Sequence, residues 1–226
     1  SVNAEQLLLC DSRDAIVQAD PFTALAGGSA PSSSLWLAQE DRCLRECPIN
    51  MGWLQRDGSA LEINAIQHLP ILCSGTILGT YDALIVALGA LVDRIQAHLP
   101  PDNKGIPWAL DQSSLNLLAW QDQLGVPFTP RGNTDGFALT LHHGHHLMLN
   151  REGRVLLGNG EVAPVVHQYD RIPWLAEHLH RQLDGIYGEQ DDHHCSSPSG
   201  SPAPSGRPTS APIAPCSVLL LMASTF

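Results

Sequence analysis

Two aspartates stand directly after the first apolar run of the chain. The run from Glu5 to Cys10 predicts a short buried strand that ends at Asp11, and Asp14 follows three positions later. Side chains at the end of a strand lie outside the hydrophobic body of the sheet, where open α/β sheets bind their ligands. Asp11 and Asp14 could therefore hold Mg²⁺ or Mn²⁺ through oxygen. A capped helix start with an Asp–Arg pair at the surface explains these residues equally well.

Arg13 lies between the two acids. Its guanidinium could contact a phosphate oxygen or brace a carboxylate. A divalent ion held by the aspartates could neutralise a diphosphate and stabilise it as a leaving group. The charge on this chain requires such an ion for a phosphate substrate, because the net charge is −11 and Lys104 is the only lysine.

Small residues follow a second predicted strand, Leu69–Cys73. Ser74, Gly75 and Thr76 come next, and small side chains allow the backbone to approach a ligand closely. A tight turn before a helix is the alternative explanation, and taken alone it is the commoner one.

Polar residues also open a predicted helix at Asp111 and Gln112, with Asn116 one turn further on. Asp111 could serve only as an N-cap. Another polar and aromatic group, which a surface helix would explain equally well, consists of Glu40, Asn50 and Trp53.

Histidine is the last residue type with ligand chemistry. A predicted strand ends in His167, which is followed by Tyr169, Asp170 and Arg171. An imidazole in such polar surroundings is a good ligand candidate. The four histidines within 142–146 also suggest metal binding, since alternate residues of a strand share a face, but we interpret them as a solvated or adventitious site.

The apolar pattern predicts the elements that position these residues. Short strands are expected from Phe137 to His167, and one or two helical turns over 14–19. The expected longer helices start at the N-cap Thr80 and end at Pro100, run over 111–124 before Gly125, and run from Pro173 to Gly185. The sum is a mixed α/β domain over 1–190. A disordered tail is predicted over 191–226, because its Ser/Pro/Gly-rich composition cannot bury a core.

Composition excludes several function classes. A net charge of −11 argues against a nucleic-acid binder, which needs a basic face. No apolar run is long enough to predict a membrane span. The six cysteines contain no C-x-x-C pair, which favours scattered buried thiols or one disulfide over a structural zinc site.

The order of the motifs resembles a group of plant, algal and microbial glycosyltransferase-like proteins and, more distantly, the nucleotide-sugar transferases of the GT-A fold. The resemblance covers about 7–175. Its motifs are D-S-R-D followed by Q-x-D-P-F, then E…C…N-x-x-W, C-S-G-T-x-x-G, D-Q-x-x-x-N and V-V-H-Q-Y-D-R. It implies a partial GT-A-like mixed sheet flanked by helices. It also implies transfer of a sugar from a nucleotide-sugar donor to a glycan or other hydroxyl acceptor, and a Golgi or secretory location if an anchor precedes the chain.

The resemblance also implies roles for individual residues. Asp11 and His167 match metal ligands, and Asp14 stands in place of the second acid, although the family has D-x-D spacing. Ser74, Gly75 and Thr76 match the segment that lines the donor sugar. Asp111 and Gln112 match the pair near the reacting carbon. An imidazole beside two carboxylates favours Mn²⁺, with Mg²⁺ as the other candidate.

Two alternatives remain open. GT-A domains have a nucleotide-binding half before the metal motif, whereas little precedes Asp11 here. This departure favours a truncated, non-catalytic relative that acts as a binding module. The other alternative is a phosphatase that forms an aspartyl-phosphate at Asp11, for which Lys104 would have to contact the phosphate.

Overall fold

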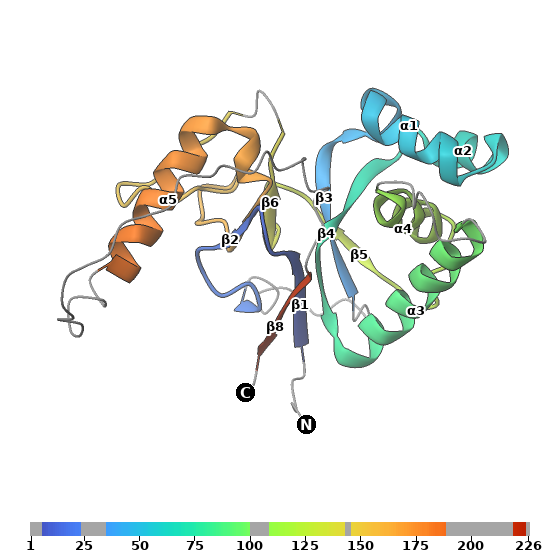
Figure 1. The fold of residues 1–226 in the computed structure, drawn as a ribbon, viewed down its shortest axis with the longest axis horizontal. Helices are drawn as coiled ribbons and strands as arrows, with labels where there is room; N and C mark the ends of the chain where they lie inside the picture. The colour runs from blue at the N-terminus through green and yellow to red at the C-terminus, as the bar shows by residue number, and fades with distance from the viewer. Residues whose placement is uncertain (1–5, 24–34, 100–108, 143–145, 189–218, 225–226) are drawn as a thin grey trace, which may run out of the picture.

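The computed structural model describes residues 6–23, 35–99, 109–142, 146–188 and 219–224. Two sheets form the centre of the molecule (Figure 1). The first sheet has the strand order β5-β3-β4-β1-β8, and the second has the order β2-β7-β6. The α/β class with mixed sheets and flanking helices is confirmed.

Most neighbouring strands of the first sheet are antiparallel, and only β3 and β5 are parallel. The second sheet joins β2 and β7 antiparallel and β6 and β7 parallel. The strands span β1 Gln6–Asp11, β2 Ala15–Val17, β3 Leu35–Cys43, β4 Pro70–Thr80, β5 Thr129–Arg131, β6 Ala138–Thr140, β7 Val165–His167 and β8 Leu219–Ser224.

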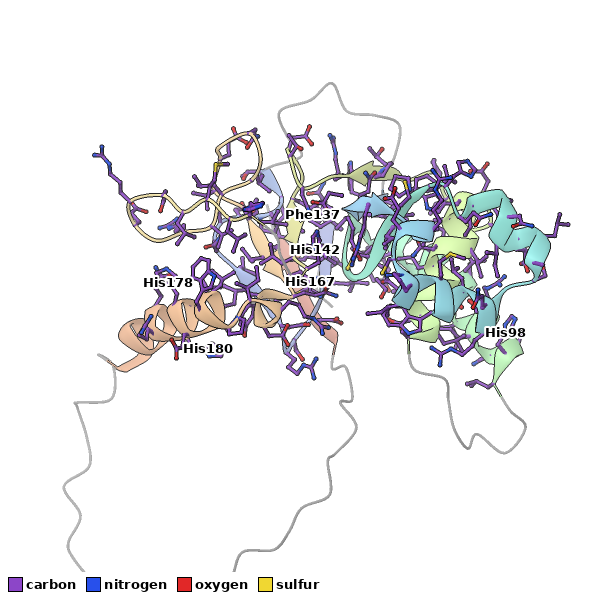
Figure 2. All side chains as sticks on the ribbon, turned by 90° about the horizontal axis from the view of Figure 1, so that it is seen from above. His98, Phe137, His142, His167, His178 and His180 are labelled. Atoms are coloured by element: carbon purple, nitrogen blue, oxygen red, sulfur yellow. The ribbon has the colours of Figure 1, made fainter. Side chains whose placement is uncertain are left out.

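Helices cover the outer faces of both sheets. Figure 1 shows α5 on one side of the molecule and the other four helices on the opposite side, and Figure 2 shows the same separation from above, with His178 and His180 far from His98. The helices span α1 Pro48–Asp57, α2 Ala60–Ile66, α3 Tyr81–His98, α4 Leu110–Trp120 and α5 Pro173–Gly188.

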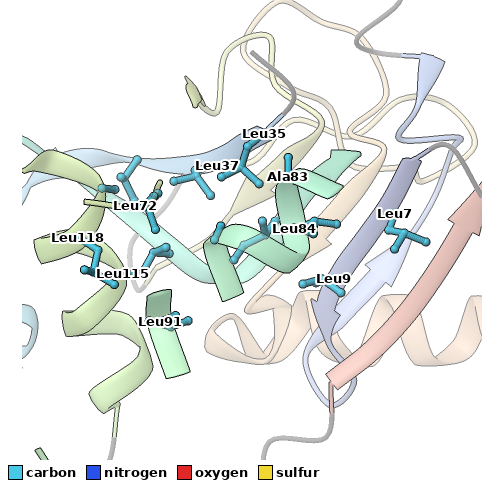
Figure 3. Close-up of a cluster of buried hydrophobic side chains, with 14 residues drawn as sticks. Leu7, Leu9, Leu35, Leu37, Leu72, Ala83, Leu84, Leu91, Leu115 and Leu118 are labelled. Carbon is cyan, nitrogen blue, oxygen red and sulfur yellow. The ribbon is translucent and has the colours of Figure 1, made fainter. Parts of the chain in front are cut away.

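Alternation along β1 divides the core into layers. Leu7 and Leu9 belong to the cluster with residues of α3 and α4 that Figure 3 shows, whereas Leu8 and Cys10 belong to a cluster that includes Ala138 and Val165 of the second sheet. This division follows from the two-residue period of a strand. The first sheet is therefore buried on both faces, which places the strand end at Asp11 beside the second sheet.

The helix that the sequence predicts best is α3. Thr80 is its N-cap and accepts a hydrogen bond from the backbone N–H of Ala83, as expected. The helix ends at His98, before the predicted Pro100, which lies outside the described residues with Pro101 and Lys104.

Two helix boundaries differ from the prediction. α4 ends at Trp120 because Asp122, with a φ of 57°, takes the left-handed position, and Gln123 N–H donates to Leu118 O in the bond that closes a Schellman cap. Gly125 belongs to the following loop. α5 continues past Gly185 to Gly188, because a single glycine weakens a helix without ending it.

Residues predicted as a helical turn form strand β2 instead. Ala15, Ile16 and Val17 pair with His167, Val166 and Val165 of β7. This tertiary pairing outweighs a weak helical preference, and the β-branched Ile16 and Val17 favour extended backbone.

The predicted disordered tail also contains a strand. Leu219–Ser224 forms β8, which pairs antiparallel with the whole of β1. The composition argument averaged over the tail and missed this apolar run, whose backbone satisfies the open edge of β1. Residues 189–218 lie outside the described part of the chain.

Candidate metal centre

Three potential metal ligands meet where the two sheets join. Asp11 ends β1, Asp14 lies in the turn between β1 and β2, and His167 ends β7. Nε2 of His167 is 3.4 Å from Asp11 Oδ2 and 3.6 Å from Asp14 Oδ1. One ligand atom from each residue lies within 4.8 Å of the others. Figure 2 shows His167 in the middle of the molecule, between α5 and the side that carries the other four helices.

Backbone contacts fix the turn that carries the two aspartates. Ala15 pairs with His167, so that Asp14 lies next to the end of β7. The Gln168 N–H donates to Asp14 O at 2.7 Å, and the Tyr169 hydroxyl donates to Arg13 O at 3.3 Å. The relative position of the acids and the imidazole is therefore set by main-chain bonds.

A bulge in β4 brings Gly75 against the cluster. Leu37 pairs with Ile77 and Gln39 with Leu72, so residues 73–76 of β4 stand opposite the single residue Ala38. The predicted strand does not end at Cys73, because β4 continues through the segment to Thr80. Bulges bend a strand and redirect its side chains, and they occur often beside active sites.

Only glycine fits at position 75. A Cβ atom there would lie 2.5 Å from His167 Cε1, 2.6 Å from its Nε2 and 2.8 Å from Asp11 Oδ2. Such distances are far inside van der Waals contact, so any larger residue would have to displace two of the three ligands. The backbone of this segment therefore lies directly against the imidazole and a carboxylate. The close approach to a ligand that the small residues suggest stays a prediction.

Amide side chains of α4 hold the bulge in place. Asn116 accepts a hydrogen bond from the Leu72 N–H at 2.9 Å and donates to Leu72 O at 2.8 Å. Gln112 Oε1 accepts from the Ser74 N–H at 2.8 Å, and its Nε2 donates to Asn50 Oδ1 at 3.3 Å. These bonds replace part of the ladder that β4 loses at the bulge.

The Ser74 hydroxyl faces two acceptors. Its oxygen lies 2.9 Å from Asp111 Oδ2 and 2.9 Å from Gln112 Oε1, and a single proton serves both. Ser74 is partly exposed and Asp111 is exposed, whereas Gln112 is buried. Ser74 and Asp111 can therefore contact a ligand, while the amide of Gln112 is engaged with the protein.

His167 is buried beside several acidic groups. It is 1% exposed, and within the described residues its Nε2 makes no hydrogen bond. Burial alone lowers the pKa of His167, but the Cys73 sulfur and the carboxylates of Asp11 and Asp14 outweigh this effect and raise it from 6.5 to about 10. The imidazole therefore lies in a strongly negative environment.

Burial acts in the opposite direction on the acids. It raises the pKa of Asp14, with Asp11 and Asp170 adding to the effect, while His167 and Arg13 lower it. Two carboxylates thus share one imidazole. Oxygen and imidazole ligands at these separations, with a buried nitrogen left without a hydrogen bond, fit a divalent cation, so the cluster could hold a metal ion.

The remaining candidate residues lie at different places around the cluster. Arg13 is exposed in the turn between the two aspartates, whereas Thr76 is fully buried and pairs with Cys10. His142 Nε2 lies 3.2 Å from Asp41 Oδ1, and 143–145 lie outside the described residues.

Sequence reasoning gave a surface helix as the alternative explanation for Glu40 and assigned no role to Cys73. Glu40 lies on β3, where it is 5% exposed and its Oε2 is 3.1 Å from Arg42 Nε. Burial raises the pKa of Glu40, while Arg42, His142 and His167 lower it. Cys73 contacts the ring of His167. Its position directly before Ser74 was the only sequence signal. Among the described cysteines, 10, 43, 47 and 73 are free thiols.

A second buried carboxylate lies on the helical side of the molecule. Asp57, at the end of α1, accepts a hydrogen bond from Ser114 Oγ at 2.9 Å, and its Oδ1 is 3.5 Å from Arg94 Nε and 3.7 Å from His98 Nδ1. The Asp57 side chain is 0% exposed. Arg94 also reaches Glu62, at 3.4 Å.

The comparisons with known proteins do not supply an assignment. None of the helices in the described ranges is long and apolar enough to cross a membrane. No protein-family model matches the chain, and no curated protein matches it in sequence.

Proposed function

We propose that this protein is a metal-dependent glycosyltransferase of GT-A type that moves a sugar from a nucleotide-sugar donor to a hydroxyl acceptor. The observation that carries the proposal is the cluster of Asp11, Asp14 and His167, three potential ligands within 4.8 Å of one another. Its supports are the ordered motifs of the sequence resemblance and the α/β class of the fold.

The donor set favours Mn²⁺, with Mg²⁺ as the alternative, because imidazole suits a transition metal better than it suits Mg²⁺. When bound, the cation would supply the positive charge that a leaving diphosphate requires, which the acidic chain cannot provide alone. Asp11 and Asp14 would hold it through carboxylate oxygen and His167 through Nε2.

Residues beside the cluster would bind and orient the donor. Arg13 is exposed between the two acids and would contact a phosphate oxygen. Ser74 and Asp111 present a hydroxyl and a carboxylate 2.9 Å apart, which would bind hydroxyl groups of the sugar. Gln112 would keep Ser74 in place, because it bonds both the backbone N–H and the hydroxyl of Ser74.

The test is turnover of a panel of nucleotide sugars by the protein, with and without Mn²⁺. Asp11→Asn and His167→Ala are expected to lower kcat/KM by about 100-fold or more, since several kcal/mol of charge stabilisation depend on the ion. The matched controls are Asp93→Asn and His68→Ala, which change exposed residues away from the cluster.

Two outcomes would contradict the proposal. If Asp11→Asn and His167→Ala both leave turnover unchanged, the metal assignment is wrong. If calorimetry shows that a nucleoside diphosphate binds with Mn²⁺ but no sugar is transferred to any acceptor, the protein is a binding module and not an enzyme.

A further inference from the structure

The second ring nitrogen of His167 points away from the two acids. Nδ1 lies 3.3 Å from the sulfur of Cys73, and both residues are 1% exposed. Cys73 is the first residue of the β4 bulge, directly after Leu72, whose backbone Asn116 holds from both sides. The sulfur therefore has a fixed position against the ring.

We propose that Cys73 is the positioning residue of His167: its sulfur accepts the Nδ1 proton in a hydrogen bond and leaves the Nε2 lone pair for a cation. The inference rests on the proposed metal-binding function of the cluster. Histidine ligands almost always donate their other ring N–H to a second group, which fixes the tautomer and the ring orientation. A carboxylate, a carbonyl or a water is the usual partner, and here a thiol sulfur occupies that place.

The surroundings of Cys73 make this weak acceptor effective. Cys73 belongs to an apolar cluster with Cys10, Phe137 and Val165, all at most 1% exposed. Water does not compete for the Nδ1 proton there, and a hydrogen bond is electrostatically stronger in a low-dielectric interior than in water. The bulge thus has two effects on the imidazole, because Gly75 leaves room for one side of the ring and Cys73 binds the other.

Cys10 provides a matched control within the same cluster. It is as buried as Cys73, at 1% exposed, and it lies opposite Thr76 on the neighbouring strand. Cys73→Ala and Cys10→Ala each remove one buried thiol from the same apolar region, but only the first removes the contact to Nδ1. A difference in metal affinity between these variants therefore measures positioning and not packing.

The first measurement is Mn²⁺ affinity, from the electron paramagnetic resonance signal of free Mn²⁺, in the full chain. Cys73→Ala is expected to weaken binding by about 10- to 100-fold, the range for loss of the partner of a ligand histidine, whereas Cys10→Ala leaves it unchanged. Cys73→Ser should fall between wild type and Cys73→Ala, because its hydroxyl can also accept the proton. Equal affinities of Cys73→Ala and Cys10→Ala would overturn the inference.

The second measurement needs no variant and therefore does not depend on folding of one. ¹⁵N NMR of the wild-type protein loaded with Zn²⁺, a diamagnetic probe, is expected to show His167 protonated at Nδ1 with the metal on Nε2. Zn²⁺ on Nδ1, or a proton retained on Nε2, would show that Cys73 does not set the tautomer. If the wild type binds neither ion, the metal-binding proposal itself is wrong and this inference falls with it.

Discussion

Two buried carboxylate clusters, one on each side of the first sheet, differ in the kind of cation that neutralises them. On the helical side, Asp57 faces the guanidinium of Arg94, which stays charged at every accessible pH. Beside the second sheet, Asp11 and Asp14 lie 3.4 Å and 3.6 Å from the imidazole of His167, which can lose its proton. Asp57 is therefore paired with a permanent cation, whereas the two acids beside His167 are paired with a cation that can become neutral.

We therefore expect the Asp57 cluster to contribute mainly to stability, and we propose that the cluster of His167 binds a cation. Asp57 joins α1 to α3 and α4 through Arg94 and Ser114. In the other cluster, burial and neighbouring acids raise the pKa of Asp14, so its charged form is disfavoured. A cation would relieve that penalty.

The largest expected change in the free energy of unfolding comes from removing the cation beside Asp57. Arg94→Met should lower the free energy of unfolding by about 3–5 kcal/mol, because it leaves the carboxylate of Asp57 buried and unpaired. Urea denaturation measures this loss. The control is Arg154→Met, which breaks the ion pair between Arg154 and Glu152. Their side chains are 47% and 69% exposed, so the loss in unfolding free energy should be less than about 1 kcal/mol. Equal losses would show that the two ion pairs do not differ.

The affinity of the His167 cluster for Mn²⁺ should depend on pH. The His167 proton must leave Nε2 before Mn²⁺ binds, so below the pKa of about 10 the apparent affinity should rise by about tenfold per pH unit. In the metal-free protein, a rise in pH has the opposite effect, because it lowers the free energy of unfolding. The raised pKa of His167 contributes stability that is fully present below 6.5 and is lost as the pH rises through about 10. A Mn²⁺ affinity independent of pH between about 6 and 8 would exclude a protonated imidazole.

Gly75→Ala tests how tightly the backbone of β4 packs against His167 and Asp11. The added methyl would meet His167 and Asp11, so we expect a loss of about 1–3 kcal/mol in unfolding free energy together with weaker Mn²⁺ binding. Gly89→Ala, in α3, is the control. A Cβ there meets nothing within 4 Å, and alanine should stabilise the helix by up to about 1 kcal/mol. Unchanged Mn²⁺ affinity in Gly75→Ala would mean that the ligands move aside freely.

The smallest change in the free energy of unfolding is expected from Asp14→Asn. Unlike Arg94→Met, this substitution should stabilise the metal-free protein. In the metal-free protein at neutral pH this substitution should raise stability, because it removes a carboxylate whose raised pKa records a penalty on its charge. The gain should disappear as the pH falls and Asp14 takes up a proton. Saturating Mn²⁺ should reverse the order of the two proteins in thermal unfolding. A variant less stable than wild type without metal would show that Asp14 is already neutralised.

Periodicity in the sequence predicted the elements that rest on local pattern, and it failed where distant contacts decide. The apolar repeat and the N-cap Thr80 were sufficient for α3. The strand β2 was not recognised, because its extended form depends on pairing with β7. The bulge of β4 was also missed. Leu72 and Ile77 face the same cluster at a separation that a regular strand does not allow.

Residue types pointed to the acids and to His167, and the fold brings these residues together. Sequence could not show that Gln112 and Asn116 hold the bulge, since the backbone groups that they bond become free only when β4 departs from β3. Cys73 escaped for a similar reason. A thiol between a strand and a small-residue segment carries no signal until the facing imidazole is in place.

The pairing of β1 with β8 has a consequence for how the chain is made. β1 leaves the ribosome well before one of its two partners, β8 (Leu219–Ser224), has been synthesised. Until then, one edge of an apolar strand stays open to pairing with other chains. We therefore expect the protein to be most prone to aggregate before β8 has paired with β1, and chaperones that cover strand edges to matter at that stage.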